Sequence, residues 1–250
     1  MPVAVVTGGS SGIGAAVARL LTGRGWHCVL LARGPERLAA VADELGAEQE
    51  VCDVGDRGAV EQTAAAIIAR HSKIDLLVNN AGIPGHAGFL DAEPERIENV
   101  ARINYLGGVW CVRAFLPALE AARPAHVVNV VSVAGTVSGA GTSGLYTASK
   151  HAQLAFSRSV SAELAPRGIR VHTVLPGFVE TEGFPQRHVL PRLAHPFVIE
   201  AEDVANAVLR AVERNQREVH VPRYYRVATL AQAITPSIVA RLGSRIKKPA

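Results

Sequence analysis

The sequence is poor in the features that mark several specialised protein classes. Its three cysteines, Cys28, Cys52 and Cys111, lie in apolar stretches without CxxC or Cys/His ligand spacing, so they are predicted to be reduced core residues of a cytoplasmic protein. No apolar run reaches the roughly 18 residues of a membrane span. Met1 and Pro2 lead straight into an apolar segment rather than a charged leader, so we expect neither a signal peptide nor an integral membrane segment.

A large excess of charge of one sign is also missing. Lys and Arg total 26 against 22 Asp and Glu, and aromatic residues make up only 5% of the chain. No basic stripe is interleaved with aromatic residues, which argues against nucleic-acid binding. His86, His188 and His195 have no carboxylate or cysteine at ligand spacing. The sequence therefore predicts no metal site, and these histidines are expected at the surface or lining a pocket.

What the chain does have is a regular alternation of short β-branched runs and longer helical patterns. Such alternation is typical of βαβ units and predicts parallel strands covered by helices. We expect a single α/β domain with a Rossmann-type, doubly wound parallel sheet of seven strands over residues 1–223, extended by a basic helical segment over residues 224–250. The predicted strands are Val3–Thr7, His27–Ala32, Glu48–Cys52, Leu76–Asn79, Ala125–Val131, Arg170–Leu175 and Glu218–Val221. The predicted helices are Ile13–Arg24, Glu36–Leu45, Arg57–His71, Pro94–Ala122, Leu145–Ala165 and Asp203–Asn215.

Two segments depart from this alternation. The stretch from Gly177 to Ile199 combines prolines with apolar residues that follow no clear period, which indicates a long loop over a substrate pocket. The tail from Tyr224 to Lys248 has apolar residues at helical spacing and an excess of basic ones. It could lie on an anionic membrane, fold over the pocket mouth or pack between subunits. The apolar residues of the loop predict a largely hydrophobic substrate; they are Phe178, Phe184, Leu190, Leu193 and Phe197.

The first predicted strand ends in a glycine-rich turn, and a helix follows at once. Such a turn presents backbone N–H groups and the positive end of a helix, and the missing β-carbons let a pyrophosphate approach closely. After the first strand of a doubly wound sheet, the turn predicts a nucleotide site. Its residues are Thr7, Gly8, Ser10, Ser11, Gly12, Ile13 and Gly14.

The residues after the next two strands indicate which nucleotide is bound. An NAD site usually has an acidic residue at the end of the second strand, whereas a 2′-phosphate requires a cation there. Arg33 follows that strand and no acid occurs before Glu36, so NADP(H) is preferred with Arg33 as the phosphate ligand. NAD(H) remains possible if Glu36 turns in to bind the ribose. Asp53 and Val54 could border the adenine, although Asp53 could equally be a turn residue.

Tyr146 and Lys150 are four residues apart on a predicted helix, which places them about one turn apart on the same face. A nearby fixed positive charge favours the phenolate, so the pKa of Tyr146 is expected to fall from its ordinary value of about 10. Such a pair predicts general acid/base chemistry.

With these residues assembled, the chain resembles the short-chain dehydrogenase/reductase family in its compact form. The resemblance extends from Val3 to about Val221 and rests on several motifs in order. They are Thr7-Gly8-x-x-x-Gly12-Ile13-Gly14, Asp53-Val54, Asn79-Asn80-Ala81-Gly82, Asn104, Ser132, Tyr146-x-x-x-Lys150 and Pro176-Gly177.

The resemblance implies a role for each matched residue. Ser132 would hydrogen-bond the substrate oxygen, and Tyr146 would exchange the proton. Lys150 would lower the pKa of Tyr146 and bind the nicotinamide ribose, while Asn104 would hold a water that connects Lys150 to solvent. The remaining cofactor contacts would come from Asn80, Ala81, Gly82, Pro176, Gly177, Val179 and Thr181.

One interval departs from the family pattern. Ser132 and Tyr146 lie 14 positions apart, about one more than is usual, and the extra residue falls between Thr136 and Gly144. Ser138 and Ser143 lie in the same loop, but neither follows a strand directly, so Ser132 is kept as the carbonyl anchor.

The expected activity is hydride transfer between NADP(H) and a ketone or secondary alcohol of a hydrophobic compound. Within the family, a 3-oxoacyl thioester reductase is the alternative. From other classes, a non-catalytic NADP(H) sensor or a membrane-associated binding protein stays open. The resemblance also implies a homodimer or homotetramer paired through the long helices from Pro94 to Ala122 and from Leu145 to Ala165.

Overall fold

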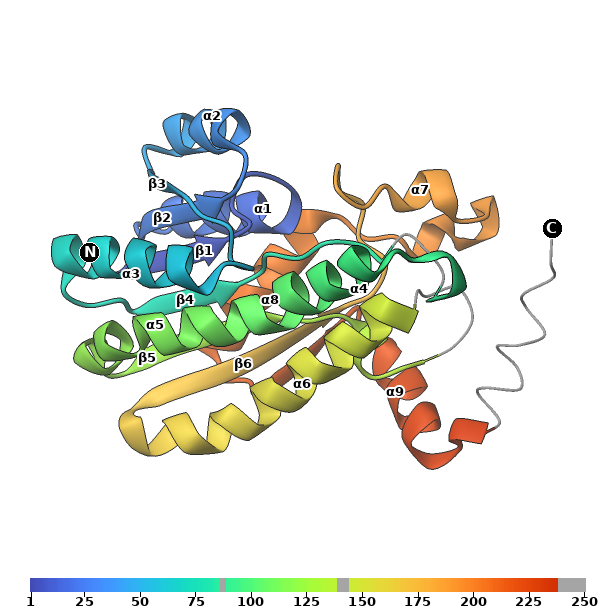
Figure 1. Ribbon diagram of the computed structural model, residues 1–250. Helices are drawn as coiled ribbons and strands as arrows, with labels where there is room; N and C mark the ends of the chain where they lie inside the picture. The colour runs from blue at the N-terminus through green and yellow to red at the C-terminus, as the bar shows by residue number, and fades with distance from the viewer. Residues whose placement is uncertain (86–88, 139–143, 238–250) are drawn as a thin grey trace.

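A computed structural model describes residues 1–85, 89–138 and 144–237 of the chain. Its described strands form one parallel sheet in the order β3-β2-β1-β4-β5-β6-β7 (Figure 1). The predicted doubly wound α/β architecture with seven strands is therefore confirmed. The strands are β1 (Val3–Thr7), β2 (His27–Ala32), β3 (Glu48–Val51), β4 (Leu76–Asn79), β5 (Ala125–Val130), β6 (Ile169–Pro176) and β7 (Glu218–Val221).

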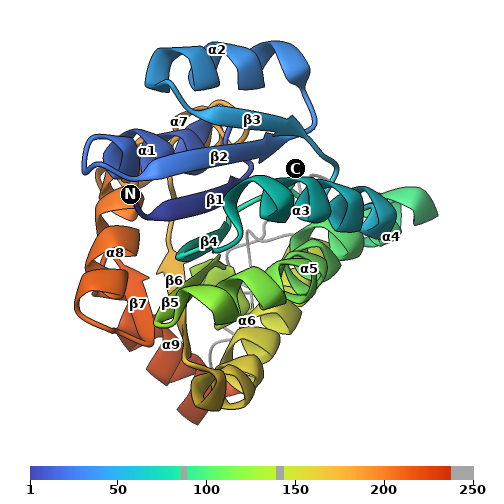
Figure 2. The same ribbon diagram turned by 90° about the vertical axis from the view of Figure 1, so that its left-hand side faces the viewer.

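Helices cover both faces of the sheet (Figure 2). One face packs against α1 (Gly12–Thr22), α2 (Pro35–Leu45) and α8 (Ala201–Glu213). The other packs against α3 (Arg57–His71), α5 (Gly107–Ala122) and α6 (Gly144–Leu164). Because both faces are covered, a central strand needs apolar residues at every position rather than at alternate ones. In β1 every side chain is buried, and all but the last, Thr7, are apolar.

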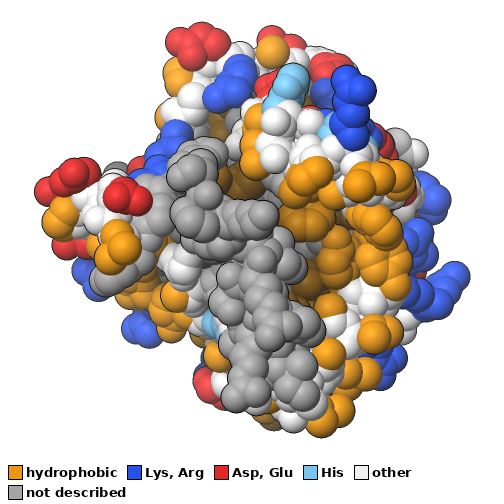
Figure 3. Space-filling model, turned by 90° about the vertical axis from the view of Figure 1, so that its right-hand side faces the viewer, with side chains coloured by type: hydrophobic (Ala, Val, Ile, Leu, Met, Phe, Trp, Pro, Cys, Tyr) orange, Lys and Arg blue, Asp and Glu red, His pale blue; other side chains and the backbone are white. Residues whose placement is uncertain are grey.

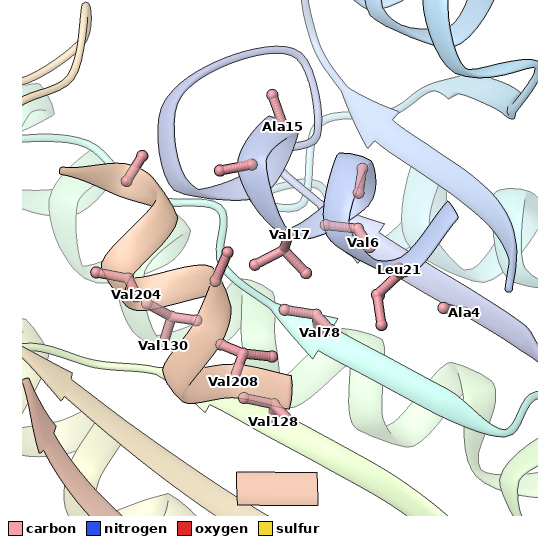
Figure 4. Close-up of a cluster of buried hydrophobic side chains, with 14 of the residues drawn as sticks. Ala4, Val6, Ala15, Val17, Leu21, Val78, Val128, Val130, Val204 and Val208 are labelled. Atoms are coloured by element: carbon pink, nitrogen blue, oxygen red, sulfur yellow. The ribbon is translucent and has the colours of Figure 1, made fainter. Parts of the chain in front are cut away.

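Small and branched side chains fill the space between the sheet and its first helical layer (Figure 4). Val6, Val78 and Val128 project from three neighbouring strands toward α1 and α8. Val17 and Val208 meet them from those two helices. The three cysteines are buried and unpaired, as the sequence predicts.

The long helix predicted from Pro94 to Ala122 is divided in the structure. It consists of α4 (Pro94–Ala101), a π-helical turn over Arg102–Leu106 and α5. A π-helical turn inserts a residue into the helix and frequently marks a functional position. Here the turn contains Asn104, whose side chain is buried.

The two irregular segments lie beyond the carboxyl ends of the strands. The segment after β6 contains α7 (Gln186–Val189) and a 3-10 helix over Arg192–Phe197. After β7 the chain forms α9 (Tyr225–Ile234), which lies below the beginning of α6 in Figure 1. Within the described ranges, no helix has the length and apolar character needed to cross a membrane.

Candidate active site

The predicted functional residues gather where the strand order reverses. The chain leaves β1 toward β2 and β3, then crosses back to β4 on the other side of β1. In open parallel sheets, ligands bind outside the carboxyl ends of the strands at such a switch point. The glycine turn follows β1, Asn80 follows β4, and Ser132 comes two residues after β5.

The glycine turn is held by the end of β4. The Thr7 hydroxyl accepts hydrogen bonds from the backbone N–H groups of Asn80 and Ala81, both at 3.0 Å. The Asn80 amide in turn donates to the carbonyl of Thr7 at 3.0 Å. Gly8 has a φ of +67°, and a β-carbon at Gly14 would lie 2.1 Å from the Gly8 carbonyl oxygen. Only glycine can satisfy both conditions, so these residues fit a close backbone cradle.

A cavity of about 240 Å³ opens beside the turn. Ser10 and Ser11 line it from the turn, while Arg19 and Arg37 line it from α1 and α2. Arg33 is exposed one residue after β2. Arg37 was not predicted as a site residue, although its position in the first turn of α2 would place it near any phosphate bound by Arg33. In the structure its guanidinium lies 3.8 Å from the Glu182 carboxylate, across the cavity.

Asp53 and Val54 form a turn after β3. The Asp53 carboxylate accepts a hydrogen bond from the Gly55 backbone N–H at 2.9 Å. Val54 is buried, and a β-carbon at Gly107 would lie 2.8 Å from the Val54 side chain. The structure thus gives Asp53 a turn contact, and its contact with the adenine stays a prediction.

Asn104 connects the end of β4 to α6. Its side-chain oxygen accepts from the Ile83 backbone N–H at 2.8 Å, and its amide donates to the Ile83 carbonyl at 3.0 Å and the Ser149 hydroxyl at 3.1 Å. A β-carbon at Gly82 would lie 3.4 Å from the Asn104 oxygen and 3.7 Å from Lys150 Nζ. Asn104, Gly82 and Lys150 therefore meet at one point.

Ser132 is fixed at the start of a 3-10 helix over Val133–Gly135. Its hydroxyl accepts from the Ala134 backbone N–H at 3.1 Å and donates to the Pro176 carbonyl at 3.4 Å. A β-carbon at Gly135 would lie 2.8 Å from the Lys150 carbonyl oxygen, so this helix packs directly on α6.

Lys150 is almost fully buried, with 3% of its surface exposed. Its ammonium donates to Gln153 Oε1 at 2.8 Å and to the Val130 carbonyl at 3.3 Å. Burial lowers the pKa of Lys150 to about 7, because the charged form loses its hydration. Gln153 was missed in the sequence, although its place three residues after Lys150 on the same helix face was a usable signal.

The pKa of Tyr146 contradicts the sequence-based expectation. Burial raises the pKa of Tyr146 to about 12, and a hydrogen bond with Ser132 opposes that shift only in part. Lys150 Nζ lies 5.7 Å from the centroid of the tyrosine ring. The ammonium is directed at Gln153 and Val130 instead of the phenol, so loss of hydration outweighs attraction to the charge.

The segment after β6 crosses over the glycine turn and Tyr146. Pro176 ends β6, and Val179 pairs with Ile199 in an isolated bridge. A β-carbon at Gly12 would lie 3.0 Å from the Thr181 side chain, so Thr181 covers the turn. The Phe184 ring lies 6.0 Å from the Tyr146 ring between centroids, which gives the tyrosine an apolar neighbour.

The helix α9 packs against the same region, a contact that the sequence did not predict in detail. A β-carbon at Gly177 would lie 2.1 Å from the Tyr225 ring, so the ring rests on that glycine. The Thr229 hydroxyl lies 2.9 Å from the Thr136 hydroxyl, beyond the 3-10 helix of Ser132, and 3.0 Å from His220 Nε2. The tail thus contacts both Gly177 and the loop that carries Ser132.

The remaining histidines and serines lie apart from these contacts. His188 is exposed, and His195 Nε2 lies 3.1 Å from the Leu190 carbonyl oxygen. Ser138 is exposed and accepts from the Gln232 amide at 3.4 Å. His86 and Ser143 lie outside the described residues, as does part of the lengthened loop before Tyr146.

Comparison with known proteins identifies the family. The family model for short chain dehydrogenases matches residues 2–188. The chain belongs to the short-chain dehydrogenase/reductase family. It is therefore an oxidoreductase by membership, as the motifs from Thr7 to Pro176 predict.

Individual relatives cover most of the chain. The sequence is 38% identical over 218 residues to 1-deoxy-11-beta-hydroxypentalenate dehydrogenase of Streptomyces avermitilis, covering 84% of this chain and 80% of the relative. It is 34% identical over 245 residues to the granaticin polyketide synthase putative ketoacyl reductase 1 of Streptomyces violaceoruber, covering 94% and 89%. Among solved structures, a variant of actinorhodin polyketide ketoreductase with NADPH has a TM-score of 0.80 and 28% identity, covering 88% of this chain and 95% of that one.

Proposed function

We propose that the protein is an NADP(H)-dependent oxidoreductase that interconverts a ketone and a secondary alcohol of a hydrophobic compound. The observation that carries this proposal is the meeting of Ser132, Tyr146 and Lys150 beside the glycine turn. Ser132 and Tyr146 share a hydrogen bond, and Lys150 lies one turn further along α6.

The residues present fit a dinucleotide. Gly8, Gly12 and Gly14 let the turn pack closely at the start of α1, where the helix end attracts the negative charge of a pyrophosphate. Arg33 carries no acidic neighbour at the end of β2, and Arg37 lines the adjoining cavity. Two arginines and no acidic residue at the end of β2 support a cofactor with a 2′-phosphate. The similar ketoreductase structure contains NADPH.

When bound, the nicotinamide supplies the hydride. Negative charge then develops on the substrate oxygen, and a hydrogen bond from Ser132 stabilises it. Tyr146 donates the proton to that oxygen. Its raised pKa of about 12 means that the phenol holds its proton at neutral pH, which suits the reduction of a carbonyl. Lys150, whose ammonium is held by Gln153 and Val130, would bind the ribose and supply positive charge as the phenol loses its proton.

The surface beyond the tyrosine supports a hydrophobic substrate. Phe178 and Phe197 are 38% and 51% exposed in the segment after β6, and Phe184 lies beside Tyr146. Figure 3 shows hydrophobic side chains gathered on this side of the molecule. Likeness to a putative ketoacyl reductase favours a 3-oxoacyl thioester as the second candidate substrate.

A carbonyl panel tests the proposal. NADPH consumption is measured with cyclic ketones, long-chain ketones, 3-oxoacyl thioesters and small charged keto acids, and each active compound is repeated with NADH. We expect turnover of apolar compounds with NADPH preferred. The change Tyr146→Phe should lower kcat by about 10²- to 10⁴-fold, since general acid catalysis contributes that much.

The control is the affinity for NADPH itself. Because Tyr146→Phe removes only a hydroxyl, the variant should bind NADPH nearly as tightly as the natural protein. Turnover restricted to small charged keto acids would reject the hydrophobic substrate. A preference for NADH would reject the role of Arg33, and full activity in Tyr146→Phe would reject the catalytic assignment.

A further inference from the structure

A second group of side chains, all of them able to bind a metal ion, lies at the amino ends of the strands. His27 is the first residue of β2, Glu48 is the first residue of β3, and His71 is the last residue of α3. Helix α3 connects the parallel strands β3 and β4, so it runs back along the sheet and ends near the amino ends of the strands. The candidate active site lies at the carboxyl ends, so this group is separate from it.

The three side chains converge on one point. His27 Nε2 lies 2.7 Å from Glu48 Oε1, and His71 Nε2 lies 2.9 Å from the same oxygen. The three atoms that could bind an ion all lie within 4.8 Å of one another. Ligand atoms around a tetrahedral zinc ion are roughly 3.3 Å apart when the bonds are about 2.0 Å long. Each imidazole would therefore have to move a few tenths of an ångström away from Glu48 to admit the ion.

Hydrogen bonds among the three side chains do not satisfy all three of these possible ligand atoms. Among the described residues, buried His71 Nε2 finds no hydrogen-bond partner of acceptable geometry, although it is close to Glu48. A buried polar nitrogen without a partner is energetically unfavourable. A metal ion among the three side chains would give this nitrogen a partner, because a neutral imidazole binds metal through its lone pair.

Arg70 orients the carboxylate from outside the group. Its guanidinium donates to Glu48 Oε2 at 3.1 Å and to Glu50 Oε1 at 2.6 Å. This contact occupies one oxygen of Glu48 and leaves Oε1 directed at the two imidazoles. Two carboxylates against one guanidinium leave a net negative charge, so a cation is still attracted. Outer contacts of this kind fix the orientation of metal ligands in proteins.

We propose that His27, Glu48 and His71 form a site for a divalent transition metal, with Zn²⁺ as the best match. Two imidazoles and a carboxylate are typical zinc ligands, with water in the fourth position. Mg²⁺ and Ca²⁺ prefer oxygen ligands throughout, so they fit less well. The side chains of His27, His71 and Glu48 are 24%, 15% and 32% exposed, which leaves the ion a path from solvent.

Such an ion would add a link between a helix and two paired strands. It would link the starts of β2 and β3 to the end of α3. Because a ligand that binds only the folded state stabilises it, bound Zn²⁺ should raise the melting temperature of the protein. The ion would act on stability and would take no part in the proposed carbonyl chemistry.

Titration of the metal-free, full-length protein with Zn²⁺ tests the site. Calorimetry should find one tight site per chain in the natural protein. We expect His71→Asn and Glu48→Gln each to weaken binding at least about tenfold, because altering even outer contacts of metal ligands has effects of 10- to 100-fold. The matched control is His188→Asn, which removes an exposed histidine elsewhere and should leave the affinity unchanged.

Thermal unfolding gives an independent reading. Zn²⁺ should raise the Tm of the natural protein and of His188→Asn, but not that of His71→Asn or Glu48→Gln. Circular dichroism at low temperature establishes that both ligand variants fold. Equal Zn²⁺ affinity in the natural protein and in both folded ligand variants would overturn the proposal. Loss of the tight site in His188→Asn alone would overturn it as well.

Discussion

The two halves of the candidate active site differ in the chemical groups that form them. The half that would hold the cofactor is made largely of backbone, since the glycine turn and the end of β4 are joined by hydrogen bonds of 3.0 Å through the Thr7 and Asn80 side chains. The half that would receive the substrate is made of apolar side chains from the segment after β6 and from α9. Several of these are largely exposed, including Leu193 at 92% and Val227 at 71%.

The difference shows which parts of the site allow variation. A backbone cradle at van der Waals contact cannot accept even a methyl group, because neighbouring main-chain atoms have nowhere to move. An exposed apolar surface can change one side chain at a time without disturbing the sheet. One cofactor site can therefore be combined with many substrate surfaces, and a family name alone leaves the substrate open.

Lys150 lies between the two halves, and its burial gives the largest expected effect. Its pKa is lowered from 10.5 to about 7, so the unfolded chain binds more protons than the folded protein between those values. The free energy of unfolding should therefore rise with pH across that window, by at most about 1.4 kcal/mol per pH unit. Urea unfolding between pH 7 and pH 9.5 measures it.

Two variants isolate this contribution. Lys150→Met removes the titrating group, so the rise in stability attributed to it should disappear. Lys73→Met removes an exposed lysine and should keep the rise. If Lys150→Met has the same pH dependence as the natural protein, the ammonium is hydrated and the pKa is not lowered.

The cofactor half should respond to a single methyl group. In Gly14→Ala the new β-carbon would lie 2.1 Å from the Gly8 carbonyl oxygen, so the turn must open. We expect NADPH to bind about 10- to 100-fold more weakly, as overpacking of this kind typically has an effect of 1–3 kcal/mol. Fluorescence titration with NADPH measures the affinity.

Gly34→Ala is the matched control for that change. Gly34 also lies between a strand and a helix near the predicted phosphate site, but a β-carbon there would have no atom of the described residues within 4 Å. Its affinity for NADPH should stay within about twofold of the natural value. Equal weakening in both variants would show that the cradle is not the specific reason.

The same contrast explains how far the sequence could predict the molecule. The glycine turn, Asn80 and the alternation of strands and helices follow from local rules, because each depends on neighbours along the chain or in one βαβ unit. Tyr146 and Lys150 share a helix face for the same reason. These predictions needed no knowledge of the tertiary packing.

What the sequence could not give depends on distant segments. The sign of the Tyr146 pKa shift was predicted wrongly, because burial of the phenol and the contact of the Lys150 ammonium with the Val130 carbonyl arise only in the folded core. The contact of Tyr225 with Gly177 joins residues 48 positions apart in the sequence. The group of His27, Glu48 and His71 has no ligand spacing at all, since its members come from three elements.

The substrate half should show a smaller and more selective response than the cofactor half. The Thr229 hydroxyl joins α9 to Thr136 at 2.9 Å and to His220 at 3.0 Å. Thr229→Val keeps the shape of the side chain and removes both contacts, which are worth roughly 0.5–1.5 kcal/mol each. Because Thr136 follows the 3-10 helix of Ser132, we expect kcat for the carbonyl substrate to fall about two- to tenfold, with NADPH affinity unchanged.

Thr235→Val is the matched control for Thr229→Val. In the part of the chain that the structure describes, the Thr235 hydroxyl bonds only to the Ala231 carbonyl in the last turn of α9, at 2.8 Å, so its loss should leave kcat unaltered. A fall in kcat for Thr229→Val alone would show that α9 helps to hold the loop that carries Ser132. A fall in NADPH affinity instead would mean that the two halves are coupled through β6 and Gly177, and the contrast between them would no longer hold.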